Sequence, residues 1–137
     1  MIEENWIEVV HKAKNEYRKI GYIECPAFGG ERVYFRSRGF THLIRKGREP
    51  RTLGQQRRRV GLFKYVVDIL VTCTAFDSCR KTNKYILTKN GLVESSAQFW
   101  SFKKYINGKN IFIVVCRFGI EPMQFLSVID DLPDIES

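Results

Sequence analysis

The chain has few of the residues that cross-link small secreted domains through disulfides or bind a metal. Its 137 residues contain only four cysteines and two histidines. Cys73 and Cys79 are separated by five residues, no CxxC pair occurs, and neither histidine lies at zinc-ligand spacing from a cysteine pair. This spacing argues against two disulfides and against a zinc site. We therefore expect free thiols, no metal and no cofactor, with Cys116 serving as a small core residue.

Long apolar runs are also absent. No stretch approaches the roughly 18 apolar residues that a membrane span requires. The beginning of the chain carries acids where a secretory signal has an uninterrupted apolar block. We expect a soluble, cytoplasmic protein without a membrane partner. With 44% hydrophobic residues, the chain is long enough for one domain with a real core and too short for two.

Acidic residues are scarce in one long stretch. Between Arg32 and Lys64, eleven lysines and arginines accompany one acid, Glu49, for a net charge of +10. The whole chain has a net charge of +8, so the remainder sums to −2. A local excess of this kind suits electrostatic capture of nucleic acid, because each cation placed at a phosphate releases a counterion. The alternative is a solvated charged face, although such faces usually mix both signs.

The first half of the chain has a helical period. Apolar residues recur at steps of three and four, which is typical of amphipathic helices. The longest predicted helix starts at Thr52, since Thr52 and Gln55 have the spacing of a capping box. The predicted helices cover residues 2–20, 40–46 and 52–70.

The helix predicted over residues 40–46 carries the main candidate for chemistry. His42, Arg45 and Lys46 follow one another at i, i+3 and i+4, so a helix would bring the imidazole and two cations onto one face. His11 falls off the apolar stripe of the first helix, which favours a solvent-facing position. A histidine that lies beside basic residues by chance is the alternative for His42.

The second half changes to a period of two, which predicts strands. Asn90-Gly91 and Asn107-Gly108 are strong hairpin signals, because both positions can adopt positive φ. We expect a loop over residues 76–83 and strands over residues 84–89, 92–106, 111–118 and 123–129.

Three tight connections in succession imply an antiparallel four-stranded meander. The apolar stripes of the helices must then cover one face of that sheet. The predicted fold is α+β, with N-terminal helices packed on a four-stranded antiparallel β-meander. We expect one domain over residues 1–137, divided into a helical part (1–75), the meander (82–129) and an acidic tail (130–137).

The order of these elements and five short motifs, GFTHLIRK, REPR, FWSF, VVCRFG and QFLSV, resemble the barnase/EndoU/colicin/RelE-like nuclease superfamily, and most of all its phage and mobile-element branch. The resemblance covers roughly residues 17–129. It implies a metal-independent endoribonuclease, often a toxin or phage effector, that cuts RNA between a helix and one sheet face. It also implies RNA as partner, with transfer RNA as a candidate, and for a toxin an acidic antitoxin or immunity protein.

Carried onto this chain, the resemblance implies a catalytic set of His42, Arg45, Lys46, Arg117 and Ser127. His42 would exchange protons, since histidine titrates near neutral pH, and the cations would stabilise the charge that develops on the phosphate. The substrate-binding residues expected are Arg48, Arg51, Arg58, Trp100, Ser101 and Gln124.

Several of these residues have a structural alternative. Trp100 suits a sheet core as well as a stacking platform, and Ser101 and Ser127 can be ordinary strand residues. Arg117 either reaches the cleft or pairs with a carboxylate such as that of Asp130. Gln124 stands where relatives often carry a histidine, and glutamine cannot exchange a proton.

Two other functions stay open at this point. A module that binds RNA or DNA without chemistry is the main alternative, and Gln124 is the best argument for it. The third is an effector that uses the basic patch to bind an acidic protein.

Overall fold

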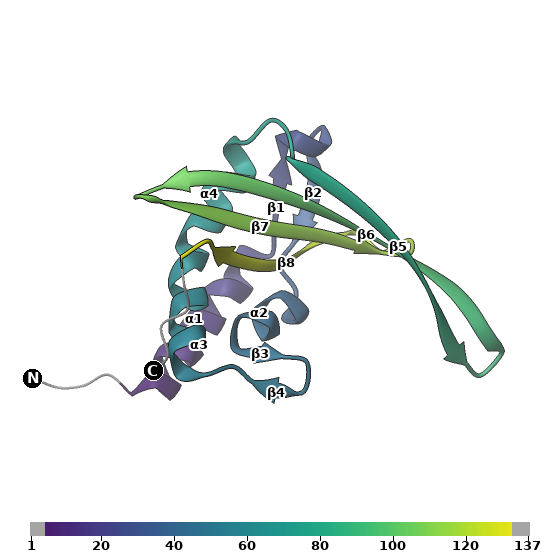
Figure 1. The fold of residues 1–137 in the computed structure, drawn as a ribbon, viewed down its shortest axis with the longest axis horizontal. Helices are drawn as coiled ribbons and strands as arrows, with labels where there is room; N and C mark the ends of the chain where they lie inside the picture. Colours follow the sequence, from purple (N-terminus) through teal and green to yellow (C-terminus); the bar gives the residue numbers. More distant parts are fainter. Residues whose placement is uncertain (1–4, 133–137) are drawn as a thin grey trace, which may run out of the picture.

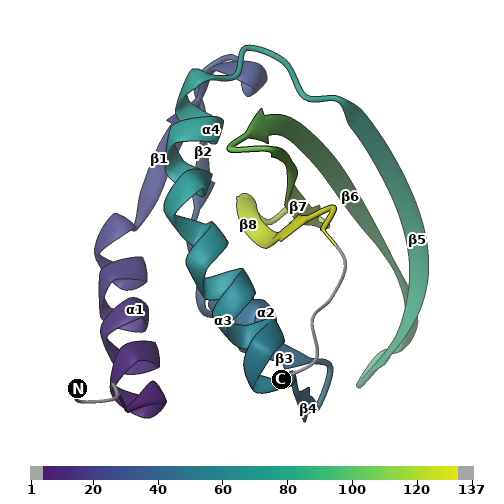
Figure 2. The ribbon, with the colours of Figure 1, turned by 60° about the vertical axis from the view of Figure 1, so that its left-hand side comes forward.

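Helices gather on one side of a curved, mostly antiparallel sheet of six strands (Figures 1 and 2). The computed structural model describes residues 5–132, and at residues 84, 86 and 87 the backbone alone. The predicted α+β class is confirmed. No helix within residues 5–132 is both long and apolar enough to cross a membrane.

The helices follow the predicted periodicity, with shifted ends. The capping box of Thr52 and Gln55 is present at the start of α3. The long helix predicted over residues 52–70 is interrupted by a 3-10 turn and continues to residue 72. The helical elements are α1 (Trp6–Ile20), η1 (Pro26–Phe28), α2 (Ser37–Ile44), α3 (Leu53–Leu62), η2 (Phe63–Tyr65) and α4 (Val66–Thr72).

The sheet is larger than predicted. Its order is β1-β2-β8-β7-β6-β5, because β2 pairs in parallel with the start of β8 and β1 pairs with β2. The prediction of a four-stranded sheet that follows the helices is therefore wrong. The strands are β1 (Tyr22–Cys25), β2 (Glu31–Tyr34), β5 (Ser78–Thr88), β6 (Gly91–Ile106), β7 (Lys109–Phe118) and β8 (Met123–Asp130), and a separate two-stranded sheet contains β3 (Arg45–Lys46) and β4 (Glu49–Pro50).

Two boundaries of the predicted meander are wrong for a common reason. The loop predicted over residues 76–83 is mostly strand, because residues 78–83 pair antiparallel with residues 96–101 of β6. The acidic tail does not begin at Asp130, which ends β8 and is buried. In both places long-range pairing outweighs a polar local sequence.

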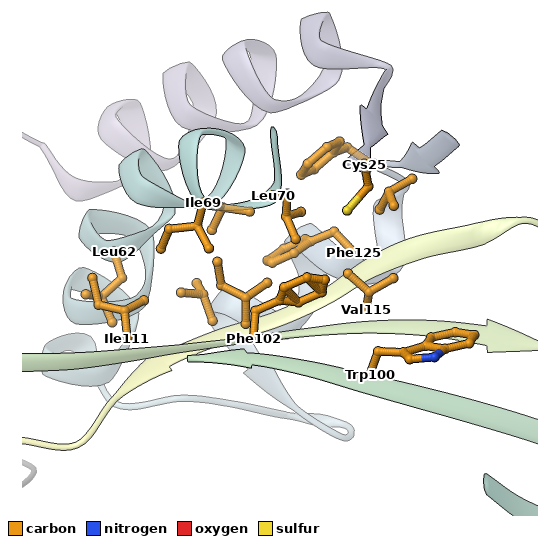
Figure 3. Packing of buried hydrophobic residues seen from close by; sticks show 14 of the residues in the cluster. Cys25, Leu62, Ile69, Leu70, Trp100, Phe102, Ile111, Val115 and Phe125 are labelled. Carbon is orange, nitrogen blue, oxygen red and sulfur yellow. The ribbon is translucent and has the colours of Figure 1, made fainter. Parts of the chain in front are cut away.

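The hydrophobic core lies between the helices and one face of the sheet (Figure 3). Leu62, Ile69 and Leu70 come from α3 and α4 and pack against strand residues that include Phe102 and Phe125. Side chains alternate along strands, so the intervening residues of these strands point to the opposite side. We call that side the open face; its residues include Arg80, Phe99, Ser101, Phe112, Cys116, Phe118, Gln124 and Ser127.

A register shift between β7 and β8, near Val114 and Val115, determines which residues of β8 face the core and which lie on the open face. Val115 lies opposite Phe125, whereas Val114 lies opposite Ser127, so Leu126 is the extra residue of a β-bulge. The bulge keeps Phe125 in the core and places Ser127 on the open face.

Candidate functional site

Helix α2 is held against β8 by a close approach at Gly39. A Cβ atom on Gly39 would lie 2.5 Å from the carbonyl oxygen of Phe125 and 2.5 Å from the hydroxyl of Tyr17. The Tyr17 hydroxyl donates a hydrogen bond to the carbonyl oxygen of Arg36, at 2.6 Å, just before the helix begins. These contacts fix the position of His42 in the last turn of α2.

The predicted helical face of His42, Arg45 and Lys46 is wrong. Helix α2 ends at Ile44, and Arg45 is extended, with φ −131° and ψ 149°. Gly47, with φ +62°, then reverses the chain into the β3–β4 hairpin, because positive φ is easily adopted by glycine. Arg45 donates from Nη1 to the carbonyl oxygen of Arg48 at 2.9 Å, within this hairpin.

His42 is half-buried between arginines. Its Nδ1 atom is buried and has no hydrogen-bond partner among the described residues, and such atoms are uncommon in folded proteins. The pKa of His42 is lowered from its ordinary value of 6.5, first by burial and then by the positive charges of Arg51 and Arg59. The imidazole is therefore neutral at pH 7 and can accept a proton.

A basic pocket of about 170 Å³ adjoins this region. Its lining comes from the β3–β4 hairpin and its exit, from the first turns of α3, and from Ile129 on the open face of β8. Four cations and one amide give the pocket the chemistry of an anion site. The lining residues are Lys46, Arg51, Gln55, Arg58, Arg59 and Ile129.

Arg58 has a structural partner as well as a place in the pocket. Its guanidinium pairs with the buried carboxylate of Asp130 and donates to the carbonyl oxygen of Leu132. The side chain of Asp130 is only 2% exposed, so this charge needs a partner within the protein. Arg58, predicted to bind substrate, therefore holds the end of β8 in this structure.

Arg117 does not join His42 and Ser127. It lies opposite Gln98 on the core side of the sheet, where its side chain is 32% exposed, and forms an ion pair with Glu31 at 2.8 Å. Ser127 lies opposite Val114 on the open face. The predicted convergence of Arg117 and Ser127 is therefore not formed, and the carboxylate that Arg117 contacts is Glu31 rather than Asp130.

Trp100 is 6% exposed and packs in the core, so its predicted stacking role is wrong (Figure 3). Gln124 lies on the open face but is buried. The hydroxyl of Ser101 hydrogen bonds with that of Ser78 across the β5–β6 pair. Arg48 is an exposed residue of the β3–β4 turn and does not line the basic pocket.

Two polar residues of this pocket, Gln55 and Arg59, were not among the predicted site residues. The spacing of Thr52 and Gln55 indicates only a capping box, and three consecutive arginines, Arg57, Arg58 and Arg59, fan around a helix and cannot all point the same way. Their spacing of i and i+4 places Gln55 and Arg59 on one side of α3, and that signal was available in the sequence.

Cys116 is a buried thiol on the open face. Burial raises its pKa to about 12, so it stays a neutral thiol at pH 7 and is a poor nucleophile.

No family model matches this chain, and neither the curated proteins nor the solved structures contain a match.

Proposed function

We propose that this protein is a metal-independent endoribonuclease in which His42 is the general base. The observation that carries the proposal is the half-buried imidazole of His42, kept neutral beside the cation-lined pocket. A neutral base next to an anion site is what cleavage by the ribose 2′-hydroxyl requires. The biological setting proposed is that of a toxin or phage effector, restrained in the toxin case by an acidic partner that covers the pocket.

The proposed reaction uses few groups. A phosphate of the RNA binds among Lys46, Arg51 and Arg59, and an imidazole nitrogen of His42 takes the proton of the adjacent 2′-hydroxyl. The 2′-oxygen forms a bond to phosphorus while the bond to the 5′-oxygen breaks, and the leaving oxygen takes a proton from water. The imidazolium of His42 then gives its proton to the hydroxide left from that water, which restores the neutral base. The products are a 2′,3′-cyclic phosphate and a 5′-hydroxyl. Each well-aimed cation contributes about 3–4 kcal/mol in comparable anion-stabilising sites.

A module that binds RNA without cleaving it is the second candidate. It is favoured by the ion pair that holds Arg117 to Glu31 on the other face of the sheet and by the burial of Gln124, because these remove two groups expected to assist the chemistry. Both candidates share the same basic pocket.

The test is incubation of total RNA with the purified protein in EDTA. His42→Ala should abolish cleavage while RNA binding persists, whereas His11→Ala, which alters the exposed histidine of α1, should leave cleavage unchanged. Both variants are purified in parallel, which separates the activity from contaminating nucleases. The cyclic phosphate is detected by mass spectrometry of the products. Binding without cleavage under any condition would assign the protein to the second candidate.

A further inference from the structure

Aromatic rings gather on the open face, outside the hydrophobic core. Phe99, Phe112 and Phe118 are each partly exposed, and none of them belongs to the described core cluster or packs against it. Phe99 and Phe118 contact each other edge to face, with ring centroids 6.1 Å apart. Folding leaves this aromatic pair at the surface, where it can contact a ligand.

Guanidinium groups lie over both rings of the pair. Arg38, from α2, lies 4.3 Å above the centroid of Phe118, and Arg80, from β5, lies 4.9 Å above that of Phe99. Both arginines are exposed residues. Flat cations on aromatic rings give planar surfaces that carry positive charge, and a nucleic-acid base stacks on such surfaces while its phosphate is attracted to them.

The neighbouring charges suit a polyanion. Lys103 is an exposed residue of the same face. Two acids near it are already engaged, since Asp77 accepts the backbone N–H of Lys103 at 2.7 Å and Asp131 accepts two hydrogen bonds from Asn110. The open face therefore combines aromatic planes with three exposed cations, Arg38, Arg80 and Lys103. Exposed Glu121 acts on Cys116 of the same face.

Helix α2 connects this surface to the candidate site. Arg38 and His42 are four residues apart on α2, so they lie on one side of the helix, about 6 Å apart along its axis. Beyond His42, the basic pocket includes Ile129, which is also on the open face of β8. A strand of RNA with a phosphate in the basic pocket can thus pass His42 and bring its next bases to the aromatic pair.

We infer that Phe99 and Phe118, with Arg80 and Arg38 above them, form a stacking subsite for unpaired bases of RNA. The inference rests on the proposed function and adds the substrate class, which is single-stranded rather than duplex RNA. Bases in a duplex are already stacked and paired, so they cannot insert their faces against these rings.

The experiment measures binding of a fluorescent 2′-O-methyl oligoribonucleotide, which cannot react by 2′-hydroxyl attack. Phe118→Leu and Phe99→Leu keep apolar volume but remove the rings, and each should weaken binding between about fivefold and 150-fold, as for base–aromatic stacking elsewhere. Phe76→Leu is the matched control, because Phe76 stacks on Phe28 away from the open face, and it should bind like the wild type. Arg38→Lys, which keeps the charge but loses the plane, should fall in between.

A second measurement keeps the protein intact. Abasic positions are introduced one at a time into the oligomer, and one or two of them should weaken wild-type binding while having little further effect on Phe118→Leu. A duplex of the same sequence should bind more weakly than the single strand at equal salt. Unchanged binding in both leucine variants, or equal binding of duplex and single strand, would overturn the inference. Cleavage in EDTA tests the proposed function separately, so a protein that cleaves RNA but is indifferent to these substitutions loses only the stacking subsite.

Discussion

The carbonyl oxygen of His42 accepts a hydrogen bond from Nε of Arg51 at 3.0 Å, which ties the end of α2 to the start of α3. Arg51 is held by its backbone as well: its N–H donates to the carbonyl oxygen of Ile44, and its own carbonyl oxygen accepts from the side chain of Gln56. These bonds place the guanidinium beside the imidazole whose pKa it lowers.

The first prediction concerns the pH dependence of His42. Its pKa in the folded protein should lie below 6.5, so the unfolded chain binds the proton more tightly. The stability that follows from this difference is fully present above the unfolded pKa, and it is lost as the pH falls from that value toward the folded pKa. Replacing Arg59 with glutamine should raise the pKa of His42, because one positive charge is removed.

The measurement for this prediction is an NMR titration of the imidazole signals. His11→Ala removes the other histidine and assigns the remaining signals to His42. The acid limb of the RNA cleavage profile should have its midpoint at the same pH. A titration at or above 6.5 in the wild type would show that the imidazole is not buried between arginines as described.

The second prediction concerns the salt dependence of RNA binding. Lys46→Gln and Arg59→Gln each remove a cation from the basic pocket. Each should lower the slope of log K against log salt by about 0.7 for a single strand, because one counterion fewer is released. Lys12→Gln, on the exposed side of α1, is the control and should leave the slope unchanged. The comparison is made by fluorescence anisotropy, and equal slopes in all three variants would mean that the pocket does not bind RNA.

The third prediction compares two helical glycines. Gly39→Ala should destabilise the protein by about 1–3 kcal/mol or more, because its methyl group would overlap Phe125 and Tyr17. Gly61→Ala should stabilise it by about 0.5–1 kcal/mol, since nothing lies within 4 Å of the new methyl group and alanine is the better helix former. Urea denaturation followed by circular dichroism measures both. Similar effects of the two substitutions would mean that α2 does not pack closely on β8.

The fourth prediction compares two ion pairs of different burial. Arg58→Leu removes the nearest cation from the buried carboxylate of Asp130, which keeps the backbone N–H of Leu132 at 3.3 Å and the ammonium of Lys109 at 3.9 Å, and should cost about 3–5 kcal/mol of stability. Arg117→Gln breaks the more exposed pair with Glu31 and should cost at most about 1 kcal/mol. Replacing both Arg58 and Asp130 with leucine should recover much of the loss. Equal costs for the two single variants would contradict the described burial of Asp130.

Local interactions were readable from the sequence. The capping box of Thr52 and Gln55 lies where it was predicted. So does the turn at Asn107 and Gly108, two residues that both have positive φ. In the other hairpin Thr88 pairs with Gly91, so its turn falls one residue before the predicted pair. Signals of this kind succeed because they depend on neighbouring residues alone.

The sequence by itself determined the α+β class, most helices and the concentration of positive charge around His42. Tertiary structure decided which of those charges meet. The pairing of β2 with β8 brings Glu31 to Arg117, and the bulge at Leu126 places Ser127 on the open face. The helices cover the opposite face of the sheet, which leaves Phe99 and Phe118 partly exposed. A strand's side chains change face with a shift of one residue, and that register depends on partners far away in the chain.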